Sequence, residues 1–310
     1  MALEAIGLRA TVVYVHGNGN KAAKDPLKAS WDRALFGEAA GTRSHMAYWA
    51  DLRYPTPLPG PEVDELESVA FEEGVDDDEL HPAELIVEAM MEAHSETLVE
   101  TPAPGGGSAT AEGVPGGALD LWLQEMAYVA DAVVQAPPTS TEEALPLPRS
   151  ARVAIFRALV KRTFVDVYAY FFGGAGEAMR DRLRATLAEV EGPVVVIAHS
   201  LGSIIAYDVL QDAAPRREVP LLVTVGSPLG VTEIQDLVVR PLRVPGSVAA
   251  WRNVADGRDL VALDRTIRPE YAPAERTTDF LVVNDSDNHH GIGQYLSTAP
   301  VRDAVLPLVG

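Results

Sequence analysis

The chain has 310 residues, of which 47% are hydrophobic, and a formal net charge of −20 at pH 7. This length and apolar content allow a large buried core in one α/β domain, whereas the negative charge argues against binding to nucleic acid or anionic membranes. The absence of cysteine excludes disulfides, thiolate metal sites and cysteine nucleophiles. Neither a membrane-spanning apolar stretch nor a signal peptide is recognisable, so we expect a cytoplasmic protein without stable membrane insertion.

The first part of the chain alternates strand and helix signals. Residues 10–15 are apolar and β-branched, which predicts a short buried strand that ends at His16-Gly17. Apolar positions at helical spacing predict a helix over 22–36, and a second strand is expected over 45–50.

An acidic segment interrupts this pattern between residues 54 and 148. It contains 21 Asp or Glu and no Lys or Arg, whereas the rest of the chain is close to neutral. Its borders are rich in proline and its middle is rich in glycine, so we interpret it as a partly flexible insertion into a core formed by 1–53 and 149–310. A long insertion of this kind is either a lid over a site or a disordered segment, and we favour the lid.

The pattern of helices and strands resumes after residue 149. Helices are expected over 151–171, 177–190, 201–212 and 291–309, and strands over 194–198, 221–225, 248–254 and 280–283. Strands that alternate with helices predict a mostly parallel central sheet with helices on both faces. The aromatic residues of 156–172 are expected either to line an acyl pocket or to pack in the core.

A serine directly follows the buried strand 194–198. The string Ala198-His199-Ser200-Leu201-Gly202 predicts a nucleophile elbow, because the sharp strand-to-helix turn needs small residues two before and two after the serine. The helix that starts there directs free N–H groups toward the site, which favours a developing oxyanion. A serine that merely caps an ordinary helix is the alternative. We predict that Ser200 is a catalytic nucleophile.

A serine nucleophile needs a base within hydrogen-bond reach and an acid that orients the base. Only His289 and His290 follow Ser200 in the sequence, so one of them is the expected base. Asp259 is the favoured acid, because the apolar residues after it would hold its carboxylate in packed structure. Asp256 precedes a glycine, which is typical of a turn, and remains the alternative.

The glycine-rich loop after the first strand is the expected second half of an oxyanion hole. Gly17 and Gly19 let the backbone approach a ligand closely. We expect the N–H of Asn18 to act there together with the N–H of Leu201. His16 precedes the nucleophile in the chain, so we expect it to order the loop rather than to act as the base.

Together these strings resemble the α/β-hydrolase superfamily, and its lipase-like and esterase-like serine hydrolases in particular. The resemblance covers 10–50 and 150–310 and rests on His16-Gly17, Ala198-His-Ser-Leu-Gly202, Gly226-Ser-Pro-Leu-Gly230, Asp259-Leu-Val and His290-Gly-Ile-Gly-Gln-Tyr-Leu296. It implies an α/β-hydrolase fold and ester hydrolysis through an acyl-enzyme, without a cofactor or metal. Some members carry Tyr-Leu and a C-terminal helix shortly after the catalytic histidine, which favours His290 over His289.

The expected substrate is a small-molecule or lipid-like ester, and an acidic lid would favour neutral ones. An acyltransferase or thioesterase could use the same three residues, and a non-catalytic binding protein could share the fold. Residues 17–22 also match a dinucleotide-binding pattern, but the acidic residue that should contact the ribose, Asp51, lies too far along the chain. We therefore favour the serine hydrolase.

Overall fold

The computed structural model describes residues 9–61, 164–211, 217–259, 264–286 and 289–309, with 153, 156, 157, 160, 161, 261 and 262. The chain divides into two compact units, one made of Met1–Ser68 and Ala169–Gly310, the other of Val69–Tyr168. The described residues of the second unit from 153 to 161 are helical. Residues 62–148 lie outside the described residues, and with them most of the predicted lid.

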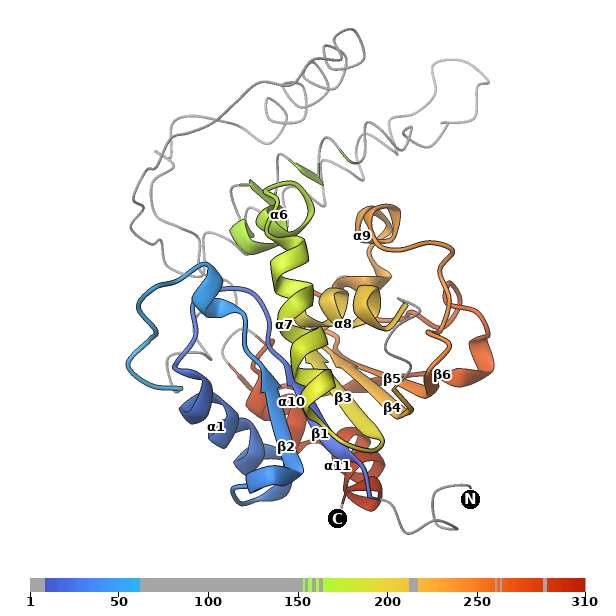
Figure 1. Ribbon diagram of the computed structural model, residues 1–310. Helices are drawn as coiled ribbons and strands as arrows, with labels where there is room; N and C mark the ends of the chain where they lie inside the picture. Colours follow the sequence, from blue (N-terminus) through green and yellow to red (C-terminus); the bar gives the residue numbers. More distant parts are fainter. Residues whose placement is uncertain are drawn as a thin grey trace, which may run out of the picture. The chain divides into compact units, whose positions relative to one another are not determined.

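A parallel six-stranded sheet forms the centre of the first unit and confirms the predicted α/β class (Figure 1). Its strands are β1 (Thr11–Val15), β2 (Ser44–Ala47), β3 (Val194–His199), β4 (Val219–Val225), β5 (Val248–Asp256) and β6 (Thr277–Val282). Their order is β2-β1-β3-β4-β5-β6, and every neighbouring pair is parallel. The carboxyl ends of all six strands therefore lie along one edge of the sheet.

Helices cover both faces of this sheet. One layer contains α1 (Lys24–Phe36), α10 (Ile292–Ser297) and α11 (Ala299–Val305), whose apolar side chains share a core cluster with β1 to β5. The other layer contains α7 (Gly176–Glu189) and α8 (Leu201–Gln211). Two further short helices are α6 (Val165–Phe171) and α9 (Thr232–Leu237). Single 3₁₀ turns occur at Gly41–Arg43, Ala50–Leu52, Pro228–Gly230, Ala274–Arg276 and Leu306–Leu308.

A buried carboxylate fastens α1 to the sheet. Asp32 accepts hydrogen bonds from the hydroxyls of Tyr14 (3.1 Å) and Ser44 (2.6 Å), and Lys28 Nζ lies 2.8 Å from it. The ring of Tyr14 also meets the indole of Trp31 edge-on, with 5.2 Å between centroids. Because a buried charge is tolerated only when it is paired and hydrogen-bonded, this cluster fixes the position of α1 against β1 and β2.

The structure departs from the predicted elements at the C-terminal end. The single helix expected over 291–309 is wrong, because α10 ends at Ser297 and α11 begins two residues later. Pro300 lies in the first turn of α11, where its missing N–H is harmless, but the same ring would interrupt a continuous helix. The short helix α9 was not expected from its sequence pattern. None of the described helices is long and apolar enough to cross a membrane.

Candidate functional site

The sheet order reverses between β1 and β3, which are neighbours with Val15 opposite Ala198. In open parallel sheets, ligands bind in the crevice beyond the carboxyl ends of the strands at such a switch point. The segments that leave β1 and β3 there begin with His16-Gly17 and with Ser200. The sheet topology thus brings together the two segments that were predicted from the sequence to form one site.

Ser200 lies in a tight strand-to-helix turn. Its φ of 52° is in the left-handed region, which a residue with a side chain rarely adopts, and its side chain is buried, with 4% exposed. A Cβ placed on Gly202 would lie 2.4 Å from the carbonyl oxygen of Val15, and one on Gly17 would lie 2.7 Å from the Cβ of Ser200. The two glycines therefore allow the ends of β1 and β3 to close around the serine.

The favoured acid and base meet in the interior. His290 Nδ1 lies 2.8 Å from Asp259 Oδ2, and the two residues are 0% and 1% exposed. The other carboxylate oxygen accepts from the N–H groups of Val261 (2.9 Å) and Ala262 (3.3 Å). Burial raises the pKa of Asp259, but the adjacent imidazole and these hydrogen bonds outweigh it and hold the pKa below its ordinary value. An ionised Asp259 requires the proton of His290 on Nδ1.

Three contacts link the segment around Ser200 to the segment around His290. The N–H of Ser200 donates to the carbonyl oxygen of Val225 at 3.2 Å. The next residue, Gly226, has a φ of 53°, and a Cβ on it would lie 2.8 Å from His290 Cε1. The Nε2 of His199 donates to the carbonyl oxygen of His290 at 2.9 Å. Ser200 and His290 therefore flank the same two residues at the end of β4.

The alternative acid and base have other partners. Asp256 accepts from the N–H groups of Arg258 and Asn284, and its own N–H donates to Tyr295 Oη. His289 is partly exposed, and its Nδ1 lies 2.9 Å from the carbonyl oxygen of Asn284. The geometry thus pairs Asp259 with His290 and assigns Asp256 and His289 to the folding of the surrounding loops.

His16 orders the loop after β1. Its Nδ1 donates to the carbonyl oxygen of Gly17 at 3.0 Å, while its Nε2 accepts from the N–H groups of Trp49 (3.0 Å) and Ala50 (3.3 Å). Burial, with the charge of a nearby lysine, lowers the pKa of His16 to about 3, so the ring is neutral. Because the N–H and C=O of a trans peptide point in opposite directions, this contact also sets the direction of the Asn18 N–H.

Lys21 is a residue of this loop that sequence reasoning missed. It is 5% exposed, and its Nζ donates to the carbonyl oxygens of Asn18 (2.6 Å) and Asn20 (3.2 Å). One ammonium group thereby fixes two peptide planes next to the crevice. Leu201, the other predicted oxyanion donor, is the buried first residue of α8. The only sequence feature that pointed to Lys21 was its position after a glycine-rich loop, and the sequence does not show in which direction its side chain lies.

Tyr295 was noted only as part of the C-terminal string, and the structure gives it a specific contact. Its hydroxyl donates to Asp259 Oδ2 at 2.6 Å, the oxygen that also receives His290 Nδ1. Burial and the neighbouring carboxylate raise the pKa of Tyr295 above its ordinary value, so the phenol keeps its proton. Tyr295 therefore restrains the carboxylate that orients the imidazole.

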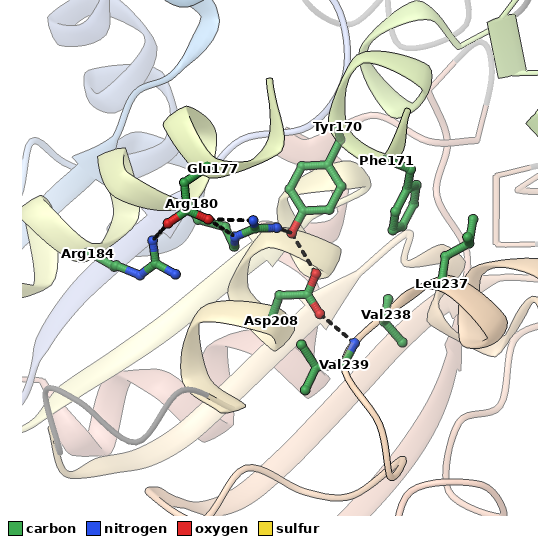
Figure 2. A pocket seen from close by; sticks show the side chains of 9 residues that line it. All are labelled: Tyr170, Phe171, Glu177, Arg180, Arg184, Asp208, Leu237, Val238 and Val239. Carbon is green, nitrogen blue, oxygen red and sulfur yellow. Dashed lines mark hydrogen bonds and ion pairs between the residues drawn. The ribbon is translucent and has the colours of Figure 1, made fainter. Parts of the chain in front are cut away.

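A separate pocket of about 440 Å³ lies on the α7 and α8 face of the first unit (Figure 2). Its walls are Tyr170, Phe171, Glu177, Arg180, Arg184, Asp208, Leu237, Val238 and Val239. Asp208 accepts from Tyr170 Oη at 2.6 Å and from the N–H of Val239 at 3.0 Å. The predicted aromatic stretch thus contributes to a pocket, but one with charged as well as apolar walls. Asp208 is about 12 Å along α8 from Ser200, so this pocket is distinct from the turn that holds Ser200.

Comparison of the chain with protein-family models and with curated protein sequences gives no match. Among the residues that the structure describes, no cluster of three or more His, Asp or Glu side chains could hold a metal ion.

Proposed function

We propose that the chain is a serine hydrolase of the α/β-hydrolase superfamily that cleaves carboxylic esters through an acyl-enzyme. The buried hydrogen bond between Asp259 and His290 is the observation that carries the proposal. This pair lies close to Ser200 in the fold. His290 is next to Gly226, and the N–H of Ser200 donates a hydrogen bond to Val225, the residue before that glycine. A strained serine, an oriented imidazole and a buried carboxylate at a sheet switch point are the parts that serine hydrolysis requires.

In the proposed acylation step, Asp259 accepts a hydrogen bond from the Nδ1–H of His290, which leaves Nε2 as the acceptor for the hydroxyl proton of Ser200. The Oγ attacks the ester carbonyl carbon, its proton passes to Nε2, and the carbonyl π electrons move onto the oxygen. The tetrahedral oxyanion then expels the alkoxide, which takes the proton from Nε2 and leaves as an alcohol. Ser200 now carries the acyl group as an ester.

In the deacylation step, water replaces the alcohol. His290 accepts one water proton as the hydroxide oxygen attacks the acyl carbon, and a second tetrahedral oxyanion forms. Its collapse breaks the bond to Oγ, which recovers a proton from His290, and the carboxylic acid departs. No cofactor or metal is required by this sequence of steps.

The two predicted oxyanion donors are supported by the loops that hold them. The direction of the Asn18 N–H is set by the bond from His16 to Gly17, and Leu201 opens α8, whose first N–H groups have no helical acceptor. Preorganised backbone donors of this kind stabilise the negative charge that develops on the carbonyl oxygen, and each typically contributes about a 100-fold to 1000-fold rate increase.

The proposed substrate is a neutral small-molecule or lipid-like ester. The chain carries a net charge of −20, which disfavours the approach of anionic substrates. A matched series of uncharged and anionic p-nitrophenyl esters tests this preference, and the uncharged members should show the higher kcat/KM. Equal or higher kcat/KM values for the anionic members would contradict it.

A fluorophosphonate probe tests the mechanism most directly, because it reacts covalently with an activated serine. We expect labelling of the wild-type chain and none of Ser200→Ala, together with turnover of p-nitrophenyl butyrate that Ser200→Ala abolishes and His290→Ala reduces to a small residual rate. His289→Ala is the matched control and should retain turnover. A wild-type chain that neither reacts with the probe nor hydrolyses esters would instead support a binding protein. Ester transfer to added alcohols in preference to water would indicate an acyltransferase.

A further inference from the structure

The side chain of His199 connects the nucleophile segment with the main chain of the base. His199 is the last residue of β3, directly precedes Ser200 and is 5% exposed. Its Nε2 lies 2.9 Å from the carbonyl oxygen of His290, and the centres of the two imidazole rings are 4.5 Å apart. A residue whose position is fixed by the sheet therefore contacts the backbone of a residue 91 positions later in the chain.

The chemistry of this contact fixes the tautomer of His199. A carbonyl oxygen only accepts hydrogen bonds, so the proton of His199 must be on Nε2. Burial lowers the pKa of His199 well below its ordinary value, and the neighbouring charges of His290 and Lys21 lower it further. The ring is therefore neutral, and its single N–H is used to hold the carbonyl group of His290.

Two further hydrogen bonds, made by the main chain of Gly291, lie within the loop of His290. The N–H of Gly291 donates to Ser286 Oγ at 2.8 Å, and Asn284 Nδ2 donates to the carbonyl oxygen of Gly291 at 2.9 Å. These contacts shape the loop but do not attach it to the strand that carries the nucleophile. The bond from His199 makes that attachment.

We propose that His199 is a positioning residue that sets the separation between the nucleophile Ser200 and the base His290. Its effect on rate rests on the serine hydrolase proposed above. Proton transfer requires heavy atoms about 2.6 to 3.2 Å apart, and a displacement of about 1 Å can lower the rate about 100-fold. His199 restrains this separation because it is covalently joined to one partner and hydrogen-bonded to the other.

Two substitutions at this position test the proposal. His199→Phe keeps a planar ring but removes the donor, and it should lower kcat roughly 30-fold to 100-fold with KM changed by less than about twofold. His199→Gln places an Nε2 donor the same number of bonds from Cα and should recover kcat to within about fivefold of the wild type. Thermal unfolding of each variant checks that the measured chains are folded. Unchanged kcat in folded His199→Phe would overturn the proposal, as would an equal loss in His199→Gln.

A double-substitution cycle separates positioning from a general structural effect. If His199 acts through the base, His199→Phe should cause no further loss of the residual esterase rate in a chain that already carries His290→Ala. A further loss of the same size as in the wild-type background would show that His199 acts elsewhere.

An NMR measurement keeps the proposal testable if the chain does not hydrolyse esters. The Nδ1 proton of His290, held by Asp259, should exchange slowly with solvent in the wild type and at least about tenfold faster in His199→Phe, with slow exchange restored in His199→Gln. Unaltered exchange in His199→Phe would reject the positioning role whatever the activity. If the wild-type chain is inactive, faster exchange in His199→Phe together with slow exchange in His199→Gln would retain the positioning role and reject the proposed function.

Discussion

The hydroxyl of Tyr295 donates a hydrogen bond to Asp259 Oδ2 at 2.6 Å. We predict that Tyr295→Phe lowers kcat about tenfold with little change in KM, since a hydrogen bond to a carboxylate is worth about 1.5 to 3 kcal/mol and its loss frees the acid that orients His290. Steady-state kinetics on p-nitrophenyl butyrate check this. Tyr271→Phe is the matched control, because that buried phenol donates instead to the carbonyl oxygen of Leu229. It should lower stability but not kcat, and equal kcat losses in the two variants would contradict the assigned role of Tyr295.

Lys21 should affect catalysis through the peptide planes that it holds. Lys21→Met retains the length and the apolar stem but removes both hydrogen bonds to the loop carbonyls. We expect kcat to fall about tenfold or more, because misdirected backbone donors stabilise an oxyanion less well. Lys24→Met, at the exposed start of α1, is the control and should leave kcat unchanged. A folded Lys21→Met variant with wild-type kcat would show that Lys21 has no role in catalysis.

The stability of the fold should depend on pH through His16. Burial lowers its pKa from 6.5 to about 3, so between these values the unfolded chain binds a proton that the folded chain does not. This contribution is complete above about pH 6.5 and is lost as the pH falls toward 3, by roughly 5 kcal/mol at most. Urea unfolding at pH 7, 6, 5 and 4 measures it. In His16→Gln, which cannot titrate, the slope of unfolding free energy against pH should decrease by an amount that corresponds to the uptake of up to one proton on unfolding. An unchanged slope would show that other groups determine the pH dependence.

The cluster around Asp32 should matter for stability alone. Asp32→Ala leaves the buried hydroxyls of Tyr14 and Ser44 without their acceptor and leaves Lys28 without its carboxylate. We expect a loss of about 3 kcal/mol in unfolding free energy, since breaking a buried charged network is among the costly single substitutions. The specific activity of the folded fraction should not change. Asp25→Ala, in the exposed first turn of α1, should change stability by less than about 0.5 kcal/mol.

Local sequence patterns predicted the elements of the fold well, because strand and helix periodicities are short-range properties. The strand before Ser200 and the helix after it were predicted nearly to their observed ends. The break between α10 and α11 was not predicted, although Pro300 is in the sequence. A proline can lie in the first turn of a new helix or can kink a continuous one, and the sequence alone does not distinguish the two cases. The strand order also could not be derived from these patterns, because it depends on which strands meet after long connections.

The site was predictable where chain order and residue type limited the choice. Two histidines followed Ser200, so the base was narrowed to a pair, and the separate pairing of Asp259 with His290 distinguishes them in space. The contacts of His199, Lys21 and Tyr295 were not predictable, because each depends on the direction of a side chain toward a distant loop. Sequence spacing carries no information on such directions.

The place of β1 between β2 and β3 in the sheet has a consequence for biosynthesis. This strand pairs with β2 soon after both leave the ribosome, but its other edge must wait for β3, whose residues follow after about 10 to 40 s of translation. During that interval the nascent chain exposes an open edge of valines of the kind that recruits chaperones or aggregates. We therefore expect the yield of native protein from cells to rise when chaperones are supplied and to fall when translation is slowed, even though both edges of β1 are paired in the finished sheet.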